Sequence, residues 1–503
     1  MPINSVFSWI VKKRVHQIEL FKQYPLETQR EVFEKNLESG KQTEFGKTHR
    51  FDLVSNQQEF REIVPLQDYE SLKPYIERTI AGEQHLLWPT TTKWFAKSSG
   101  TTQDKSKFIP VTKESLEDCH YKGGKDLLGL YYTNNPDTKL YYGKHLIVGG
   151  SAQINYLSSD SYFGDLSAII MKNLPFWCEI RRTPSKDIAL MTGWEEKLEK
   201  MAHATAEEDV HIIAGVPSWT LVLLKRILQI TGKKTISEVW PRLELFMHGG
   251  VSFTPYKKQF QDIIQNPKMN YVETYNASEG FFGIQDQNEA DDMLLMLDYG
   301  IYYEFIPMEH FNDENPIAIG LEDVELNKNY ALVISTNGGL WRYVVGDTIQ
   351  FTNLYPFRIK VTGRTKHFIN AFGEELVVEN SDKAFAVACE TVNAKLNEYT
   401  GAPVFMTNEN TGGHEWLVEF EQVPNDFDLF AKTFDETLKS LNSDYESKRT
   451  NDFTMRFPKI ITVPNGTFYA WLKSKNKLGG QHKVPRLSNN RDIIEDIKKH
   501  SNA

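Results

Sequence analysis

The sequence predicts an α/β protein with a large N-terminal domain of layered sheets and helices and a small C-terminal α+β domain. Two observations support this prediction. Short apolar strands that run into glycine-containing loops alternate with helical segments, as at 146–151, 211–219 and 243–251. The chain also has 503 residues, which is too long for one ordinary core.

The composition is that of an ordinary folded protein, with 40% hydrophobic and 12% aromatic residues. The formal net charge of −10 opposes nonspecific nucleic-acid binding, which needs an excess of Lys and Arg. Cys119, Cys178 and Cys389 are odd in number and far apart, so they predict no disulfide framework and indicate a cytoplasmic protein. No stretch approaches the roughly twenty apolar residues that span a bilayer, and no membrane association is expected.

Residues 1 to about 90 are expected to be helical, with breaks at Pro25, Pro65, Pro74 and Pro89. The chain start has a short apolar patch before its basic residues, which favours an amphipathic helix over a signal peptide. Strands and helices alternate from Trp94 onward. One expected strand covers 93–97, and one expected helix follows the strand at 211–219 and ends at Gly232.

The second half of the chain begins with a strong hairpin signal. Asn337-Gly338-Gly339 separates two β-rich runs, and such a turn needs positive φ angles. A smaller unit follows, and the domain boundary is expected near 362–366, with domains at 1–365 and 366–503. Its predicted elements are a strand at 415–420, a helix at 426–445, a hairpin turning at Pro464-Asn465-Gly466 and a terminal helix from about Asn490.

The loop at 97–107 is the first candidate site. Small hydroxyl residues and a glycine let a backbone approach an anion closely, while lysines add positive charge. The residues concerned are Ser98, Ser99, Gly100, Thr101, Thr102, Lys105 and Lys107. A polar surface turn is the alternative. The Walker A pattern is absent, which argues against a P-loop NTPase.

Two further candidates lie at the expected ends of strands. In 271–280, Tyr275, Ser278 and Glu279 could stack on a base, bind phosphate and hold Mg²⁺; the alternative is a solvated strand end. In 340–351, Asp347 follows Gly346 and could accept hydrogen bonds from a ribose; the alternative is a capped tight turn.

The last two candidates are basic. Arg364 could reach a phosphate or ribose, although arginines in surface turns are common. Lys483 lies in a glycine-flanked basic loop and could be a mobile cation for the charge on a reacting carboxylate. The alternative for Lys483 is a solvated loop.

The order of these segments is more specific than any one of them. SSGTT, HGG, YNASEG, WRYVVGD, GR and QHKVPR follow one another along the chain. This order resembles the acyl-adenylate-forming superfamily and, within it, the acyl acid amido synthetases of the Gretchen Hagen auxin-responsive promoter family. The resemblance covers nearly the whole chain. The family also has non-plant members, and a member from outside plants is expected.

The resemblance implies an enzyme that uses ATP and Mg²⁺ to activate a carboxylic acid as an acyl-adenylate and then transfers the acyl group to an amino acid amine. It implies an adenylation domain at 1–365 with the ATP and acyl-acid sites, and a small domain that rotates between the two steps. The implied phosphate contacts are Ser98, Ser99, Gly100, Thr101, Thr102, Lys107 and Ser278. The implied adenine contacts are Gly249, Gly250 and Tyr275, the ribose contact is Asp347, and Glu279 contacts Mg²⁺. Arg364 marks the hinge, and Lys483 is the catalytic lysine of the small domain.

One residue departs from the family pattern, because members often have a glycine at the position of Asp104. An acidic side chain near phosphates is unfavourable unless it points outward or pairs with Lys105. Two other functions remain open: an acyl-CoA ligase, with a thiol acceptor, and a non-catalytic nucleotide-binding relative. The acid and the acceptor are not predicted, and a monomer or weak oligomer is expected. The aromatic residues near the expected acid pocket, for which core packing is the default, are Tyr131, Tyr132, Tyr156, Phe163, Trp177 and Trp219.

Overall fold

The computed structural model divides the chain into two compact units. The first comprises residues 1–250 and 266–361, and the second comprises residues 251–265 and 362–503. The structure describes residues 2–98, 107–149, 155–156, 161–174, 179–191, 194–250, 253–254, 256–365, 368–369, 371, 374, 376–404, 412–442, 445–446, 449, 455–478, 483–488 and 490–501. Mixed α/β architecture, with a large N-terminal part and a separate C-terminal part, is thereby confirmed.

The first unit begins with helices, as predicted. They are α1 (Pro2–Gln23), α2 (Pro25–Gly40), α3 (Glu44–Thr48), α4 (Gln57–Ile63) and α5 (Tyr69–Ile80). Asp68 caps α5 in a capping box, accepting from the Ser71 amide at 2.9 Å. The break predicted at Pro74 is wrong, because Pro74 lies inside α5. A proline removes one backbone bond, and the cap and the buried face of this helix keep it continuous.

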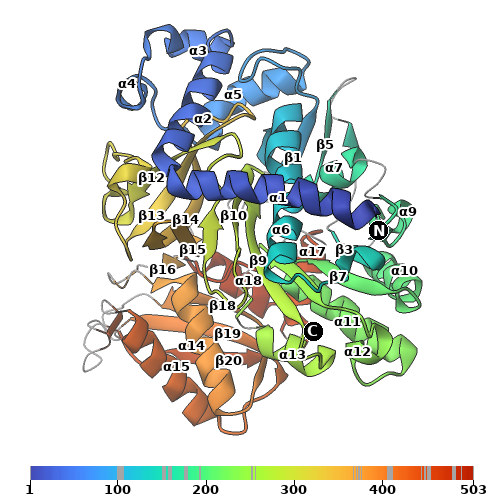
Figure 1. The fold of residues 1–503 in the computed structure, drawn as a ribbon. Helices are drawn as coiled ribbons and strands as arrows, with labels where there is room; N and C mark the ends of the chain where they lie inside the picture. Colours follow the sequence, from blue (N-terminus) through green and yellow to red (C-terminus); the bar gives the residue numbers. More distant parts are fainter. Residues whose placement is uncertain are drawn as a thin grey trace. The chain divides into compact units, whose positions relative to one another are not determined.

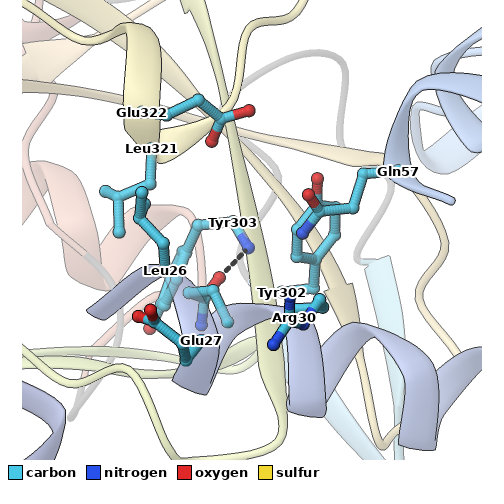
Figure 2. Close-up of a pocket in the computed structure, with 9 residues that line it drawn as sticks. Leu26, Glu27, Arg30, Gln57, Tyr302, Tyr303, Leu321 and Glu322 are labelled. Carbon is cyan, nitrogen blue, oxygen red and sulfur yellow. Dashed lines mark hydrogen bonds between the residues drawn. The ribbon is translucent and has the colours of Figure 1, made fainter. Parts of the chain in front are cut away.

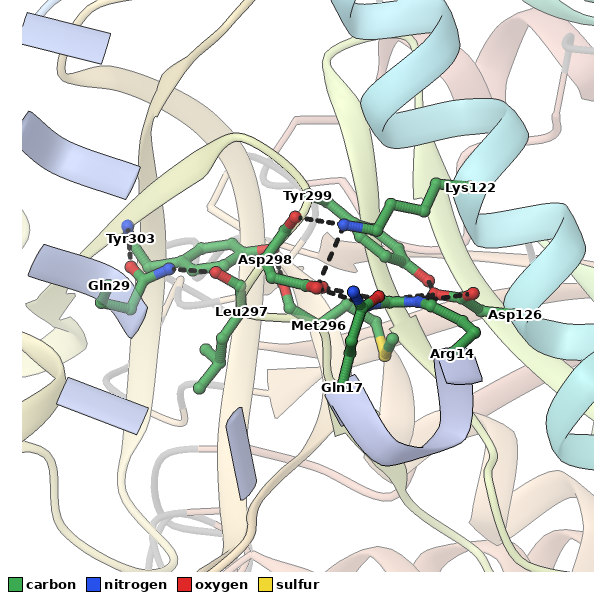
Figure 3. A network of polar contacts seen from close by, with 10 residues as sticks. All are labelled: Arg14, Gln17, Gln29, Lys122, Asp126, Met296, Leu297, Asp298, Tyr299 and Tyr303. Atoms are coloured by element: carbon green, nitrogen blue, oxygen red, sulfur yellow. Dashed lines mark hydrogen bonds and ion pairs between the residues drawn. The ribbon is translucent and has the colours of Figure 1, made fainter. Parts of the chain in front are cut away.

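A polar network ties α1 to the body of the first unit (Figure 3). The guanidinium of Arg14 donates to Asp126 on α6 (Tyr121–Asn134) and to Asp298, both at 2.6 Å. Lys122 contacts Asp298 at 3.0 Å, and the Tyr299 hydroxyl donates to Asp126 at 2.8 Å. Because these residues come from α1, α6 and the connection before β12 (Ile301–Pro307), the network fixes the N-terminal helix against two distant segments.

The described strands of the first unit form two sheets. A four-stranded sheet has the order β2 (Lys107–Val111), β1 (Trp94–Ser98), β5 (Tyr162–Gly164) and β4 (Asn155–Tyr156). An eleven-stranded sheet has the order β12 (Ile301–Pro307), β13 (Asn329–Thr336), β14 (Tyr343–Leu354), β15 (Phe357–Arg364), β11 (Met293–Leu295), β10 (Gly280–Ile284), β9 (Asn270–Ala277), β8 (Leu245–Gly249), β7 (Val210–Gly215), β3 (Lys144–Val148) and β6 (Arg182–Thr183).

The large sheet is parallel from β6 to β9. It is antiparallel from β9 through β10 and β11 to β15, and again from β14 through β13 to β12. The predicted strands at β1, β3, β7 and β8 and the hairpin between β13 and β14 are confirmed. Helix α7 (Leu166–Asn173) contacts β1 and β5 of the four-stranded sheet. Helices α9 (Lys186–Ala189), α10 (Trp194–Ala206), α11 (Pro217–Thr231) and α12 (Ile236–Val239) accompany the parallel half of the large sheet, with α10 to α12 beside β7 in Figure 1. The predicted helix end at Gly232 is confirmed, with φ of 65°.

The second unit has a three-stranded sheet in the order β18 (Lys395–Val404), β19 (Gly413–Gln422) and β20 (Lys459–Val463). Trp416 on β19 packs against Phe385 and Phe434, which lie on α14 (Val378–Thr391) and α15 (Phe427–Leu441). These two helices lie side by side in Figure 1. The short strands β16 (Phe368–Ile369) and β17 (Leu376–Val377) and helices α13 (Lys257–Ile264), α17 (Thr467–Ser474) and α18 (Asp492–Lys498) complete the described elements of this unit.

The C-terminal predictions are confirmed for the strand at 415–420 and for the terminal helix, while the predicted hairpin at 464–466 is wrong. Gly466 has φ of 91° and precedes α17 as its N-cap. A glycine at positive φ is equally suited to a tight turn and to a helix entry, so the local pattern did not distinguish them. The long helix is shorter than expected and ends at Leu441.

Candidate functional site

A buried hydrogen bond joins two of the predicted site residues. The Tyr275 hydroxyl donates to Asp347 Oδ2 at 2.8 Å, and the two residues are 7% and 6% exposed. Tyr275 lies on β9 and Asp347 on β14, with β15, β11 and β10 between these strands in the sheet. In a flat sheet, four spacings of about 4.8 Å would separate the two strands by roughly 19 Å. The sheet must therefore curl strongly here, and the curl brings the two side chains together.

Two β-bulges lie beside this contact. In β10, Phe282 is an extra residue opposite Tyr275 on β9, and its ring centre lies 4.8 Å from that of Tyr275. In β14, residues 345–347 lie opposite the single residue Leu332 of β13. Gly346 has φ of 90° at this bulge, a conformation that suits glycine. Bulges change the direction of individual side chains, and this one sets the direction of Asp347. The predicted position of Asp347 at a strand end is wrong: it lies within β14.

The turn after β9 carries Ser278 and Glu279. Ala277 pairs with Gly280, so these two residues form the whole connection between β9 and β10. Ser278 is buried and Glu279 is half-buried. A two-residue turn between paired strands restricts the direction of both side chains, which places a hydroxyl and a carboxylate next to each other at the end of β9.

Gly249 and Gly250 lie at the end of β8, at the same edge of the sheet as the end of the neighbouring strand β9. Gly249 ends β8 and pairs with Thr274, the residue before Tyr275. A Cβ atom at Gly249 would lie 2.4 Å from the Thr274 carbonyl oxygen, a distance that no side chain tolerates. Gly250 has φ of 80°. The two glycines therefore keep the backbone of β8 close to β9 beside the Tyr275–Asp347 contact.

The candidate phosphate loop lies largely outside the described residues. Ser98 ends β1, whereas Ser99, Gly100, Thr101 and Thr102, together with Asp104 and Lys105, fall in the part that is not described. Lys107 opens β2, where it pairs with Ser98 across the strands. Its ammonium lies 5.6 Å from the centre of the Tyr69 ring, a cation–π arrangement.

The remaining two predicted residues belong to the second unit. Arg364 is the last residue of β15, and Lys483 precedes a segment that is hydrogen bonded to β18; both side chains are exposed. The structure thus brings Gly249, Tyr275 and Asp347 together, with Ser278 and Glu279 in the turn directly after the strand that carries Tyr275. Arg364 and Lys483 are described separately because they lie in the other unit.

Residues 341 and 342 have structural roles that the sequence did not indicate. The Trp341 indole donates to the Leu87 carbonyl at 3.0 Å in the core. Arg342 donates to both oxygens of Glu304 at 3.0 and 3.1 Å, and both residues are at most 4% exposed. A lone glutamate within the apolar strand at 301–307 was the available signal, because a buried carboxylate requires a cationic partner.

The described cysteines are poor nucleophiles. Burial raises the pKa of Cys119 and of Cys389 to about 12, and the Phe281 amide donates to Cys119 Sγ at 3.2 Å. A thiol that stays protonated at neutral pH does not attack an acyl group. Cys178 lies outside the described residues. Cys119 and Cys389 are therefore not suited to covalent catalysis.

A cavity of about 190 Å³ lies between α2 and β12 (Figure 2). Its lining combines carboxylates and a guanidinium with tyrosine rings. The lining residues are Leu26, Glu27, Gln29, Arg30, Gln57, Tyr302, Tyr303, Leu321 and Glu322. None of the predicted site residues lines it. Among the described residues, no group of three or more His, Cys, Asp or Glu side chains is arranged to hold a metal, and no described helix is long and apolar enough to cross a membrane.

Three family models match the chain in succession. They are the GH3 family N-terminal domain at residues 14–269, the GH3 family central domain at 294–364 and the GH3 family C-terminal domain at 379–492. A similar protein is the indole-3-acetic acid-amido synthetase GH3.3 of Arabidopsis thaliana, which is 23% identical over 93% of this chain and 90% of its own length.

Two solved structures show the same fold. The GH3.15 acyl acid amido synthetase matches with a TM-score of 0.78 at 19% identity, covering 96% of this chain and 95% of that one. A 2-hydroxyisobutyryl-CoA ligase in its postadenylation state matches with a TM-score of 0.58 at 11% identity, covering 98% of this chain and 91% of that one.

Proposed function

The chain belongs to the GH3 family, and on that premise we propose how it works as an acyl acid amido synthetase. A carboxylate oxygen of the acid attacks the α-phosphorus of ATP, the bond to the β-phosphate breaks, and pyrophosphate leaves. The amine of an amino acid then attacks the acyl carbon, loses a proton, and releases AMP. The products are an amide, AMP and pyrophosphate. The observation that carries the proposal is the Tyr275–Asp347 contact beside Gly249, on a chain that the family models cover in succession.

The nucleoside is proposed to lie against β8, β9 and β14. Gly249 and Gly250 present backbone alongside adenine, the Tyr275 ring packs on it, and Asp347 accepts hydrogen bonds from the ribose hydroxyls. The hydrogen bond from Tyr275 supports this arrangement because it holds the buried carboxylate in one orientation. A carboxylate that is already oriented loses less conformational freedom when the ribose binds.

The phosphates are proposed to contact the loop at 98–102, Lys107 and Ser278. Backbone amides and hydroxyls of such a loop suit phosphate oxygens, and a lysine offsets their charge. Glu279 with Ser278 fits Mg²⁺, which is usually held by one or two carboxylates together with substrate phosphates rather than by a complete protein cage. When bound, Mg²⁺ would neutralise charge on the phosphates and on the departing pyrophosphate.

The small domain is proposed to supply Lys483 to the reacting carboxylate and to reposition it by rotation between the two steps. We assign the ATP and acyl-acid sites to residues 1–365 and this moving part to 366–503, with Arg364 at the hinge. The exposed position of Lys483 supports a cation that works at a surface of its own unit. A cytoplasmic location is proposed as well, because the chain has only 3 cysteines.

An amine acceptor is favoured over a thiol. The GH3.3 relative and the GH3.15 structure are amido synthetases, whereas the CoA ligase resembles this chain more distantly, with the lower TM-score. A non-catalytic relative is disfavoured because Glu279, Asp347 and Lys483 are all present. The CoA ligase remains the second candidate, and an acceptor assay separates the two.

The acid is proposed to bind between the helical N-terminal part and the strands around 146–219, where several aromatic side chains lie. Tyr131 and Trp219 are buried, and the Tyr131 hydroxyl accepts from Asn270 at 2.9 Å, which agrees with core packing. Tyr156 is 74% exposed and Phe163 is half-buried, so these two are the better candidates for contact with a ligand. Trp177 lies outside the described residues.

Replacing Glu279 by Ala tests the proposed chemistry of the first step. We expect acid-dependent exchange of labelled pyrophosphate into ATP to fall at least about 100-fold, because the carboxylate that would hold Mg²⁺ is removed. Glu31→Ala, at an exposed position on α2, is the matched control and should retain full exchange. Unchanged exchange in the Glu279 variant would exclude this residue from the Mg²⁺ site.

A further inference from the structure

The segment that follows Lys483 is fixed to β18 by backbone hydrogen bonds. The Gly401 amide donates to the Arg486 carbonyl at 2.8 Å, and the Ser488 amide donates to the Gly401 carbonyl at 3.1 Å. The Thr400 hydroxyl donates to the Pro485 carbonyl at 2.6 Å. Within the same segment, Val484 and Leu487 are buried in hydrophobic clusters. The backbone of residues 484–488 is therefore fixed, and Lys483 is the residue directly before this segment.

The side chain of Arg486 anchors this segment through three contacts. It forms an ion pair with Glu398 on β18. Its Nη2 donates to the hydroxyl of Tyr256 at 2.9 Å, and its guanidinium lies 4.4 Å from the centre of the Tyr399 ring. All four residues belong to the second unit, and Tyr256 and Tyr399 are at most 2% exposed.

These contacts depend on an arginine. A planar guanidinium can pair with a carboxylate, donate to a hydroxyl and stack on a ring at the same time, whereas a lysine ammonium cannot. Further hydrogen bonds hold the partners in turn. The Tyr399 hydroxyl donates to Asp382 at 2.7 Å, and Glu398 accepts from the Tyr399 amide at 3.0 Å. The anchor of the segment is thus part of a rigid core.

We propose that Arg486 is a positioning residue for Lys483: its contacts with Glu398, Tyr256 and Tyr399 set where the lysine ammonium stands during acyl-adenylate formation. This inference rests on the role of Lys483 in the proposed function. Lys483 and Arg486 are three positions apart in the chain, a span of at most about 11 Å. A displacement of about 1 Å in a catalytic group can lower a rate about 100-fold, so a loosened anchor affects the rate without touching the substrates.

Arg486→Lys and Tyr256→Phe test the inference by acid-dependent pyrophosphate exchange and thermal unfolding. We expect the arginine variant to lose about 10-fold or more in kcat, and the tyrosine variant about threefold. The KM for ATP should change less than about twofold, because neither residue belongs to the proposed ATP site. Arg491→Lys is the matched control: Arg491 is also paired with a buried glutamate of this unit, Glu415, at 2.8 Å but lies eight positions beyond Lys483. Its kcat should be unchanged.

The decisive comparison is made in a Lys483→Ala background. If Arg486 acts through Lys483, adding Arg486→Lys to that background lowers exchange less than twofold further. Equal losses in both backgrounds would show a structural role alone and overturn the inference, as would full activity of the folded single variants. If Arg486→Lys does not fold, the same cycle with Tyr256→Phe decides. Failure of the proposed function is separable, since it appears as absent exchange in the unaltered protein or full exchange in Lys483→Ala.

Discussion

Tyr275 and Asp347 could each be selected from the sequence, but their contact could not. Both follow recognisable patterns, YNASEG and WRYVVGD. Their meeting depends on two bulges and on the curl of a sheet in which three strands lie between β9 and β14. No local pattern encodes the strand register that brings together two residues 72 positions apart in the chain. The residues were therefore predictable, and the geometry of the site was not.

Tyr275→Phe removes only the hydroxyl that holds Asp347. Losing a hydrogen bond to a charged group costs about 1.5 kcal/mol, which corresponds to roughly a 10-fold higher KM for ATP. The ring that would pack on adenine remains, so kcat should change less. Tyr355→Phe, at a position that is 74% exposed, is the control and should behave as the unaltered protein. An unchanged KM for ATP would mean that the hydroxyl does not prepare Asp347 for the ribose.

Arg342 illustrates a residue within a functional motif whose role is stability. Burial raises the pKa of Glu304, and Arg342 opposes this shift by pairing with the carboxylate. Arg342→Met leaves that carboxylate without its main partner, and we expect a loss of about 3–5 kcal/mol in the free energy of unfolding, measured by denaturant titration. Arg30→Met, with a 63% exposed side chain, is the control. A loss below about 1 kcal/mol in Arg342→Met would contradict this reading of the pair.

At the scale of elements, apolar patterns predicted well where strands and helices form. Proline and glycine signals predicted poorly where elements end or turn. The strands at 94–98, 144–148 and 245–249 formed where apolar runs met glycines. Pro74 and Gly466 did not end or turn their elements as expected, because the outcome at each position depends on the cap and on tertiary packing. A proline or a positive-φ glycine limits the backbone without specifying which element follows.

Helix α18 offers an element-scale prediction with a defined pH dependence. Glu415 on β19 contacts Lys459 on β20. It also contacts Arg491 and Lys498, which attach α18 to the sheet. Burial alone would raise the pKa of Glu415, but these cations dominate and lower it to about 2 from 4.5. Because the folded pKa lies below the unfolded one, the stabilisation is complete above about pH 4.5 and is lost as the pH falls toward 2.

Glu415→Gln should therefore destabilise the second unit by on the order of 2 kcal/mol at pH 7 and should flatten the acid side of its stability profile. Thermal unfolding between pH 2 and 7 measures both effects. Glu390→Gln, an exposed position on α14, should leave the profile as it is. A variant that loses stability equally at all pH values would show that the carboxylate charge is not responsible.

At the scale of the whole molecule, sequence order identified the family more securely than any single motif. Each motif also has a simple structural explanation, and only their succession along the chain is specific. A division of the sequence into contiguous domains could not show that residues 251–265 cluster with the C-terminal unit. That segment is held there by tertiary contacts, such as the hydrogen bond from Gln259 to the Leu396 carbonyl at 2.5 Å. Substrate preference is likewise not readable from the ATP motifs, because pocket residues vary independently of them.

The most direct test of the account is a product assay with the full chain, ATP and Mg²⁺. Aryl, indolyl and aliphatic acids are each supplied alone, with amino acids, or with coenzyme A, while pyrophosphate release and products are followed. We expect acid-dependent pyrophosphate exchange without an acceptor, and an amide with stoichiometric AMP once the right amino acid is present. A thioester formed with coenzyme A, and no amide with any acid and amino acid, would contradict the account.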